Sequence, residues 1–243
     1  MNKEKFRQLS GIEITDEQFA QFQKLLQSYN DWNSKINISA IKDEEGIWEK
    51  HFIDSVVGYK YLENPAKKNI LDMGTGGGFP LLPLSILLPT ASFSGLDSVA
   101  KKLKVVQEMA RESGIKIPRI LHGRAEDFAH NPKFREKFDI VVTRAVAPWP
   151  TLLELTLPFV KLGGEFLAYQ GPAILDDLQT YKNLEKKLGA KIIKVHEDQV
   201  GENSRVFVHM KKVQKTPKTY PRAVGIPKKN PLKETLINKK FTR

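Results

Sequence analysis

Four glycines lie within five positions of the stretch LDMGTGGGFPLLPLS, which begins at Leu71. Backbone of this kind, placed after a strand and before a helix, lets N–H groups and the helix N-terminus approach a ligand. A GxxxxGK[ST] phosphate loop is excluded, because no Lys-Ser or Lys-Thr pair follows the glycines. The dinucleotide pattern GxGxxG/A also fails, because it would place Phe79 or Leu81 where a small residue must let the helix pack closely.

The spacing Asp72-x-Gly74-x-Gly76-x-Gly78 instead fits the loop of S-adenosylmethionine-dependent methyltransferases, whose cofactor carries no phosphate. In such a loop the glycines let the backbone run beside the methionine and ribose portions of the cofactor. The alternative is an ordinary tight turn between a strand and a helix. Pro80 would then suit the first turn of that helix, where its missing N–H costs nothing.

Two further positions could contact an adenosine. Asp97 ends the next strand, where a carboxylate can accept both ribose hydroxyls, and it could also cap a helix that begins at Ser98. The segment HGRAEDF ends the third strand, and its backbone at Ala125 and Glu126 could read the adenine edge. The alternative for Glu126 is a solvated acid in the first turn of a helix.

The segment VVTRAVAPWP after the fourth strand would face a methyl acceptor. It lacks the [DN]PP[YFW] tetrapeptide that holds an exocyclic amine, and the absence of cysteine excludes methylation of cytosine C5. Ring nitrogens and hydroxyls remain as acceptors. Guanine N7 carries a free lone pair at neutral pH, so alignment and exclusion of water would suffice without a general base.

Two side chains of this segment are candidates for the reaction site. Arg144 is the candidate catalytic residue and could fix the surroundings of the cofactor or bind the RNA backbone. Its alternative role is an internal ion pair with Asp72 or Asp97. Trp149 could stack on a flipped base, or it could lie in the core.

The composition excludes several classes of protein. With no cysteine, the 243 residues hold no disulfide, thiolate metal site or cysteine nucleophile, and the five histidines show no metal-ligand spacing. We therefore expect no metal. The sequence contains no run of about 18 apolar residues, so we expect no membrane span. The polar start MNKEKFRQLS lacks the apolar core of a signal peptide. We expect a cytoplasmic protein, and a monomer.

The positive charge is concentrated at the C-terminal end. From Lys211 to Arg243 the chain holds 11 basic residues and one acidic residue, whereas the first 210 residues hold 28 basic and 27 acidic groups. Such a segment suits a polyanion, because neutralising phosphates releases condensed counterions. The alternative is a solvated tail that only aids solubility. Its four prolines, at positions 217, 221, 227 and 231, indicate extended chain.

Periodicity predicts helices first and then an alternation of strands and helices. Apolar residues recur every three or four positions over 15–32, after a capping box of Thr15 and Gln18, and a second helical stretch covers 44–61. Alternating strands and helices imply a parallel sheet covered on both faces. The expected strands are 70–72, 92–97, 119–122, 138–143 and 165–169, with helices at 98–113 and 150–160.

The last two apolar runs, KIIKVHED and SRVFVHMKK, are separated by only five residues. Since no crossover helix fits there, they must pair as an antiparallel hairpin. The fold class is therefore α/β: a Rossmann-like class I methyltransferase fold, with a mostly parallel seven-stranded sheet that ends in the hairpin. We divide the chain into a helical N-terminal cap (1–66), a methyltransferase core (67–211) and a basic, proline-containing tail (212–243).

Several motifs, taken in order and spacing, resemble the glucose-inhibited division protein B family over nearly the whole chain. They are WNSKINIS (32–39), KHFIDS (50–55), LDMGTGGGFPLLPLSI, LDSVAKK, RAEDF, TRAVA and, in the tail, TYPRAVGIPKKNPL. The resemblance implies a methyltransferase that uses S-adenosylmethionine to modify N7 of a guanine in small-subunit (16S) ribosomal RNA, near the decoding site. It implies cofactor contacts at Gly74, Phe79, Ala125, Glu126 and Arg144, with Asp97 at the ribose.

Two positions depart from the family pattern. Members commonly have a small residue where this chain has Leu81, and Lys-Gly where it has Gln170-Gly171. A glutamine can hydrogen-bond to RNA but carries no charge, so an RNA-binding module with a vestigial cofactor pocket is one alternative function. The other is a nicotinamide-dependent oxidoreductase, which Phe79 and the terminal hairpin disfavour.

Overall fold

The computed structural model describes residues 1–233, so the last ten residues of the predicted tail lie outside the described residues. Within the described part, seven strands form one sheet in the order β3-β2-β1-β4-β5-β7-β6. All pairs from β3 to β5 are parallel, and β7 runs antiparallel to both β5 and β6. The strands are β1 (Asn69–Met73), β2 (Ser92–Asp97), β3 (Arg119–His122), β4 (Phe138–Arg144), β5 (Val160–Gln170), β6 (Ala190–Val200) and β7 (Asn203–Lys212).

This topology confirms the predicted α/β class I methyltransferase sheet and its terminal hairpin. The five parallel strands lie where their apolar runs predict them, although β5 begins five residues earlier than expected, at Val160. The expected helix over 150–160 correspondingly ends sooner. It consists of α8 (Trp149–Thr156) and a 3-10 turn (Leu157–Phe159).

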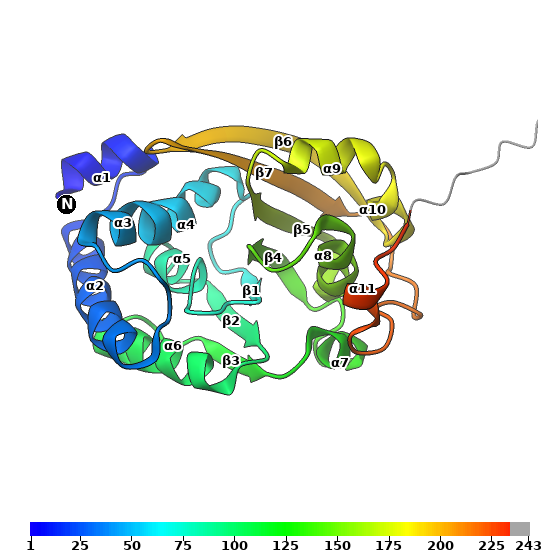
Figure 1. Ribbon diagram of the computed structural model, residues 1–243, viewed down its shortest axis with the longest axis horizontal. Coiled ribbons are helices and arrows are strands. Elements are labelled where there is room, and N and C mark those ends of the chain that lie inside the picture. Colours follow the sequence, from blue (N-terminus) through cyan, green and yellow to red (C-terminus); the bar gives the residue numbers. More distant parts are fainter. Residues whose placement is uncertain (234–243) are drawn as a thin grey trace, which may run out of the picture.

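Helices cover both faces of the sheet (Figure 1). A separate apolar cluster lies under each helical layer. One layer holds the N-terminal helices together with α5 and α6, and the other holds α7 to α11. The first layer comprises α1 (Lys3–Ser10), α2 (Asp16–Ile36), α3 (Glu44–Ile47), α4 (Asp54–Val57), α5 (Leu81–Leu87) and α6 (Ala100–Glu112). The second comprises α7 (Ala125–His130), α8, α9 (Ile174–Thr180), α10 (Leu184–Lys187) and α11 (Ile226–Lys229).

The N-terminal helices are built as their sequence predicts, with one irregularity. The capping box of Thr15 and Gln18 starts α2. The second helical stretch is continuous from Glu44 to Tyr61, but it passes through a π-helical segment (Trp48–Ile53) between α3 and α4 and ends in a 3-10 turn (Gly58–Tyr61). Widened turns of this kind are frequent at functional sites, and this one carries His51, which lines the cavity described below.

Aromatic rings join the N-terminal helices to the rest of the first layer. Phe22 and Trp48 both pack against Phe52, whose ring centroid lies 6.0 Å from that of Phe79 beside the glycine loop. The apolar cluster is therefore continuous from α1 to the sheet. The proposed boundaries after residues 66 and 211 stay predictions.

The described part of the tail is folded against the second layer, which corrects the expectation of extended chain. Thr216, Pro221, Pro227 and Leu232 are buried. The Arg135 guanidinium donates to the carbonyls of three tail residues, 216, 217 and 220. The proline count indicated extended chain because it takes no account of such partners, which supply the hydrogen bonds that a free tail would find in water.

One ion pair holds this segment to α8. Glu154 is completely buried, and its carboxylate accepts from Nε of Arg222 at 2.9 Å, from Nη2 at 2.7 Å and from the Arg222 backbone N–H at 2.8 Å. A buried carboxylate needs such partners, because an uncompensated charge in the interior is costly. The pair therefore links the tail to the core.

Replacing Arg222 with Met removes two of these donors and leaves the Glu154 charge poorly compensated. We expect the free energy of unfolding to fall by about 3 kcal/mol, measured by urea denaturation. Lys218→Met, at an exposed position of the same segment, serves as the control and should change stability by less than about 0.5 kcal/mol. Equal unfolding midpoints for the two variants would contradict the packing of the tail.

Candidate active site

A cavity of about 560 Å³ opens at the carboxyl ends of the parallel strands. Ligands of open α/β sheets bind at this edge, where the strand order reverses beside β1. Seven of the nine candidate cofactor residues line the cavity, and Asp72 and Gly78 do not. Those that line it are Gly74, Gly76, Phe79, Asp97, Ala125, Glu126 and Arg144. Residues from the N-terminal part and from the tail complete the cavity wall. They are Ile38, Ser39 and His51 from the N-terminal part and Lys228 from the tail.

The loop between β1 and α5 is rich in glycine because its backbone angles and its neighbouring atoms disfavour side chains. Gly74, Gly76 and Gly78 have φ angles of +78°, +54° and +91°, a region that L-residues with side chains rarely adopt. A Cβ on Gly74 would lie 2.6 Å from Cγ2 of the neighbouring Val146. The loop therefore lets main chain face the cavity at a point where a side chain does not fit.

Asp97 holds the glycine loop from the neighbouring strand. One carboxylate oxygen accepts from the backbone N–H of Gly76 at 2.9 Å, and the other accepts from the N–H of Val99 at 2.9 Å. Helix α6 begins at Ala100 with Val99 as the preceding residue, so the expected helix start at Ser98 is two residues early. Asp97 thus stabilises the turn before the helix and fixes the loop at the same time.

Asp72 is part of the scaffold below the loop. It is fully buried, and Oδ2 accepts from the backbone N–H of Leu81 at 3.2 Å, which satisfies a free donor at the start of α5. Burial raises the pKa of this carboxyl to about 7.

The departure at Leu81 has a steric explanation. Its side chain is buried over Gly95 of β2, where an added Cβ would lie 2.8 Å from Cδ2 of Leu81. The glycine in the neighbouring strand makes room for the larger side chain after the loop.

Glu126 is buried at the other end of the cavity, so it is not a solvated first-turn acid. Oε1 accepts from the backbone N–H of Gly225 at 3.0 Å and from Arg124 at 3.4 Å. Oε2 is buried and has no hydrogen-bond partner among residues 1–233. An unpartnered buried acceptor at the cavity wall fits a ligand that brings an N–H donor, as an adenine amino group does.

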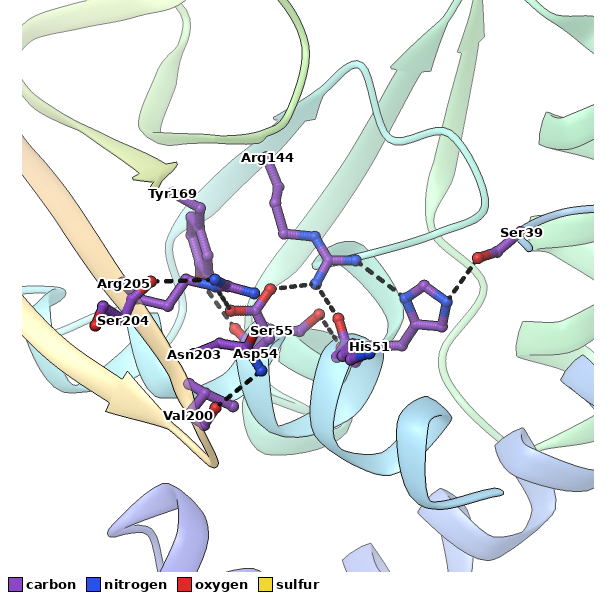
Figure 2. Close-up of polar contacts among 11 residues, drawn as sticks. Ser39, His51, Asp54, Ser55, Arg144, Tyr169, Val200, Asn203, Ser204 and Arg205 are labelled. Carbon is purple, nitrogen blue, oxygen red and sulfur yellow. Dashed lines mark hydrogen bonds and ion pairs between the residues drawn. The ribbon is translucent and has the colours of Figure 1, made fainter. Parts of the chain in front are cut away.

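Arg144 ends β4 and forms an ion pair with a residue that the sequence interpretation did not consider (Figure 2). Nη1 donates to Oδ2 of Asp54 at 2.8 Å and to the carbonyl of Lys50 at 3.0 Å. The other oxygen of Asp54 accepts from Nε of Arg205 on β7 at 2.5 Å. The expected alternative, a pair between Arg144 and Asp72 or Asp97, is therefore wrong, because the π-helical segment brings a nearer carboxylate.

His51 joins this cluster at the cavity wall. Its ring stacks on Phe79 with centroids 4.7 Å apart, and Nε2 lies 3.2 Å from the hydroxyls of both Ser39 and Tyr29. Nδ1 lies 3.5 Å from Nη2 of Arg144. Burial, with a further contribution from the positive charge of Arg144, lowers the pKa of His51 to about 4, so the ring is neutral near pH 7.

Three members of this cluster were not assigned from the sequence. His51 and Asp54 stand in the motif KHFIDS, and Arg205 stands in the last strand, SRVFVHMKK. An acidic residue inside the mostly apolar run FIDSVV is a signal of a buried ion pair, but no sequence pattern identifies partners 90 and 151 residues away.

Two other candidates lie away from the cavity surface. Trp149 is only 2% exposed and packs in the second apolar cluster, so the core alternative is correct and base stacking is not available to it. Gln170 ends β5, is partly buried and does not line the cavity. Its substitution for lysine has no explanation in the contacts of this region.

Among residues 1–233, no three His, Asp or Glu side chains are grouped so that they could hold a metal ion. No helix in this range is long and apolar enough to span a membrane.

Asp72→Asn should change how stability depends on pH. The pKa of Asp72 is about 7 when folded against an ordinary 3.8, so the folded state holds this proton more tightly than the unfolded chain does. The carboxyl therefore contributes stability below about pH 4, and the contribution is lost as the pH rises through about 7. Relative to the wild type, the variant should gain stability over this interval, by about 4 kcal/mol at most.

Urea denaturation of both proteins at about pH 4.5, 6 and 8 measures this difference, and comparing the two cancels the other titrating groups. Asp31→Asn, which removes an exposed carboxyl group, is the matched control. Parallel stability curves for wild type and Asp72→Asn would contradict the raised pKa.

Known proteins resemble the chain over almost its full length. Ribosomal RNA small subunit methyltransferase G of Clostridium novyi is 42% identical over 225 residues, which is 91% of this chain and 92% of that protein. The protein of the same name from Brevibacillus brevis is 40% identical over 237 residues, which is 96% of this chain and 100% of the relative.

Solved structures share the fold at low sequence identity. TrmN from Thermus thermophilus has a TM-score of 0.51 at 18% identity, over 66% of this chain and 48% of its own. A chain of the Haloferax volcanii complex between the Trm112 methyltransferase activator and a methyltransferase has a TM-score of 0.56 at 13% identity, over 76% of this chain and 98% of its own. The GidB family, described as rRNA small subunit methyltransferase G, matches residues 17–207. With this match and the two close relatives, the chain belongs to the GidB family.

Proposed function

We propose that this S-adenosylmethionine-dependent methyltransferase modifies N7 of a guanine in small-subunit ribosomal RNA, near the decoding site. The family and its cofactor class follow from the full-length relatives. The observation that carries the proposal for this chain is the cavity, whose lining combines bare glycine backbone, an arginine and a buried acceptor that has no partner among residues 1–233. We further propose that the chain acts in the cytoplasm as a monomer.

The cavity residues fit the expected parts of the cofactor. Asp97 would hold the ribose, and Ala125 and Glu126 the adenine, with the free Oε2 of Glu126 as an acceptor. The loop at Gly74 and the ring of Phe79 would then border the methionine portion, together with Arg144. When bound, S-adenosylmethionine supplies a methyl group on a positively charged sulfur.

The polar groups of the wall support an acceptor that needs no general base. His51 is the only histidine among the described residues that line the cavity, and hydroxyl groups and Arg144 occupy both of its ring nitrogens. Asp97 is engaged by two backbone N–H groups. Since guanine N7 already has a free lone pair, the wall needs only to orient the base and exclude water.

The tail and its charge support an RNA substrate. Helix α11 carries Lys228 and Lys229 in its last turn, and Lys228 reaches the cavity wall. Lys218 and Lys233 are exposed in the same segment. Cations at the cavity edge would hold phosphates of an RNA whose target base enters the cavity.

The function is tested by incubating the protein with labelled S-adenosylmethionine and small-subunit ribosomal RNA from cells that lack it. We expect label at one guanine, and mapping should find it at N7. Labelling of another atom or another RNA would contradict the proposal, and RNA binding without any label would favour the vestigial module.

Gly74→Ala should abolish this labelling. The added Cβ meets Val146 and the φ angle of +78° becomes strained, so the cofactor wall is displaced. Calorimetry should show S-adenosylmethionine affinity lowered at least about tenfold, while RNA affinity stays within about twofold. Gly114→Ala, which has a φ of +66° and open space around it, is the matched control. Unchanged cofactor binding in Gly74→Ala would refute the assigned role of the loop.

Replacing Lys218, Lys228, Lys229 and Lys233 with Gln should weaken RNA binding and flatten its salt dependence. Each lost phosphate contact lowers the slope of log K against log salt by about 1. The control changes the same charge at four exposed lysines outside the tail, Lys24, Lys116, Lys191 and Lys194. Substituting lysines leaves the buried contacts of the tail intact, which deleting residues 212–243 does not. Equal slopes for the two variants would show that the tail has no specific role.

A further inference from the structure

Asp54 lies between two arginines, and each of its oxygens has a different partner (Figure 2). Oδ2 accepts from Arg144 and Oδ1 from Arg205, and the side chain of Asp54 is only 6% exposed. Two positive charges thus meet one negative charge. The cluster keeps one surplus positive charge, which a simple Asp54–Arg144 pair would lack.

The surplus positive charge can act on a ligand in the cavity through Arg144. Arg144 is 14% exposed and lines the cavity, whereas Arg205 lies outside the cavity wall with 24% of its side chain exposed. Nη1 of Arg144 donates to Asp54 and to the carbonyl of Lys50. Within residues 1–233, Nε of Arg144 donates no hydrogen bond, and Nη2 of Arg144 has only the long contact with His51. The guanidinium therefore keeps donors for a further acceptor.

The position of Arg144 along the cavity selects the kind of acceptor. If Asp97 and Glu126 hold the adenosine, the opposite end is bordered by Gly74, His51 and Arg144, where the methionine portion with its carboxylate belongs. Arg144 is too little exposed to be reached by a phosphate of the RNA backbone, but a small ligand inside the cavity can contact it. A carboxylate is also a group that the guanidinium fork can bind through two parallel N–H donors.

We propose that Arg205 is a positioning residue for the cofactor. By taking one oxygen of Asp54, it holds that carboxylate in the orientation that anchors Arg144, and it offsets the negative charge that would otherwise cancel Arg144. The surplus positive charge then favours the carboxylate of the methionine portion. This inference rests on the proposed function, because it needs S-adenosylmethionine in the cavity.

The experiment compares two ligands that differ only in that carboxylate, S-adenosylhomocysteine and decarboxylated S-adenosylhomocysteine. Calorimetry on the full chain gives both affinities for wild type, Arg205→Met and Arg205→Lys. In Arg205→Met we expect about fivefold to tenfold weaker binding of S-adenosylhomocysteine. Affinity for the decarboxylated ligand, which is a cation, should be unchanged or higher. Arg205→Lys retains the charge and should recover most of the loss.

Thermal unfolding of each variant checks that it is folded at the temperature of the titrations. If Arg205→Met weakens both ligands equally, Arg205 is merely structural and the inference is wrong. If neither ligand is affected, or if only RNA affinity falls, the surplus charge does not serve the cofactor, and the inference is again wrong. If the unsubstituted protein binds neither ligand, the proposed cofactor itself is wrong and the inference falls with it, an outcome distinct from the others.

Discussion

The buried carboxylate of Asp54 is the constraint on which the geometry of the site depends. It lies where three segments meet that are far apart in sequence: the N-terminal helices, the end of β4 and the hairpin strand β7. A buried ion pair adds little net stability, but removing one partner is strongly destabilising. The three segments must therefore keep their relative positions. The π-helical segment adds the carbonyl of Lys50 as a second acceptor for Arg144, which fixes the guanidinium at the cavity wall.

Asp72 and Asp97 both hold the backbone around the glycine loop. Asp72 satisfies the first N–H of α5 from below, and Asp97 fixes the loop by the N–H of Gly76. Neither carboxylate pairs with Arg144, since Asp54 already does. The loop is thus shaped by internal hydrogen bonds. A cavity formed in this way needs little ordering when a ligand binds, so less binding energy is spent on conformational entropy.

The sheet could be predicted from the sequence because its signals are local. Alternating apolar runs and a link too short for a crossover helix determine the parallel strands and the hairpin. The cofactor loop could be found for the same reason, since its residues are contiguous. The partner of Arg144, the burial of Trp149 and Glu126 and the packing of the tail depend on contacts between residues 68 to 99 positions apart, or on tertiary burial. Composition suggested a free, proline-rich tail, whereas Glu154 and Arg135 bind it to the core.

The N-terminal part and the tail both contribute residues to the cavity, which the class I methyltransferase sheet alone would leave incomplete. The N-terminal part contributes Ile38 and His51 at one end of the wall, and the tail contributes Lys228 and the Gly225 N–H that orients Glu126 at the other. The parallel sheet alone would offer only the glycine loop and the strand ends. Because the tail both carries the basic charge and touches a residue proposed to hold the adenine, the proposed RNA contact and the proposed adenine contact fall on the same segment. The Gly225 N–H stands directly before α11 and donates to Glu126, so the packing that places the lysines of α11 also orients this carboxylate.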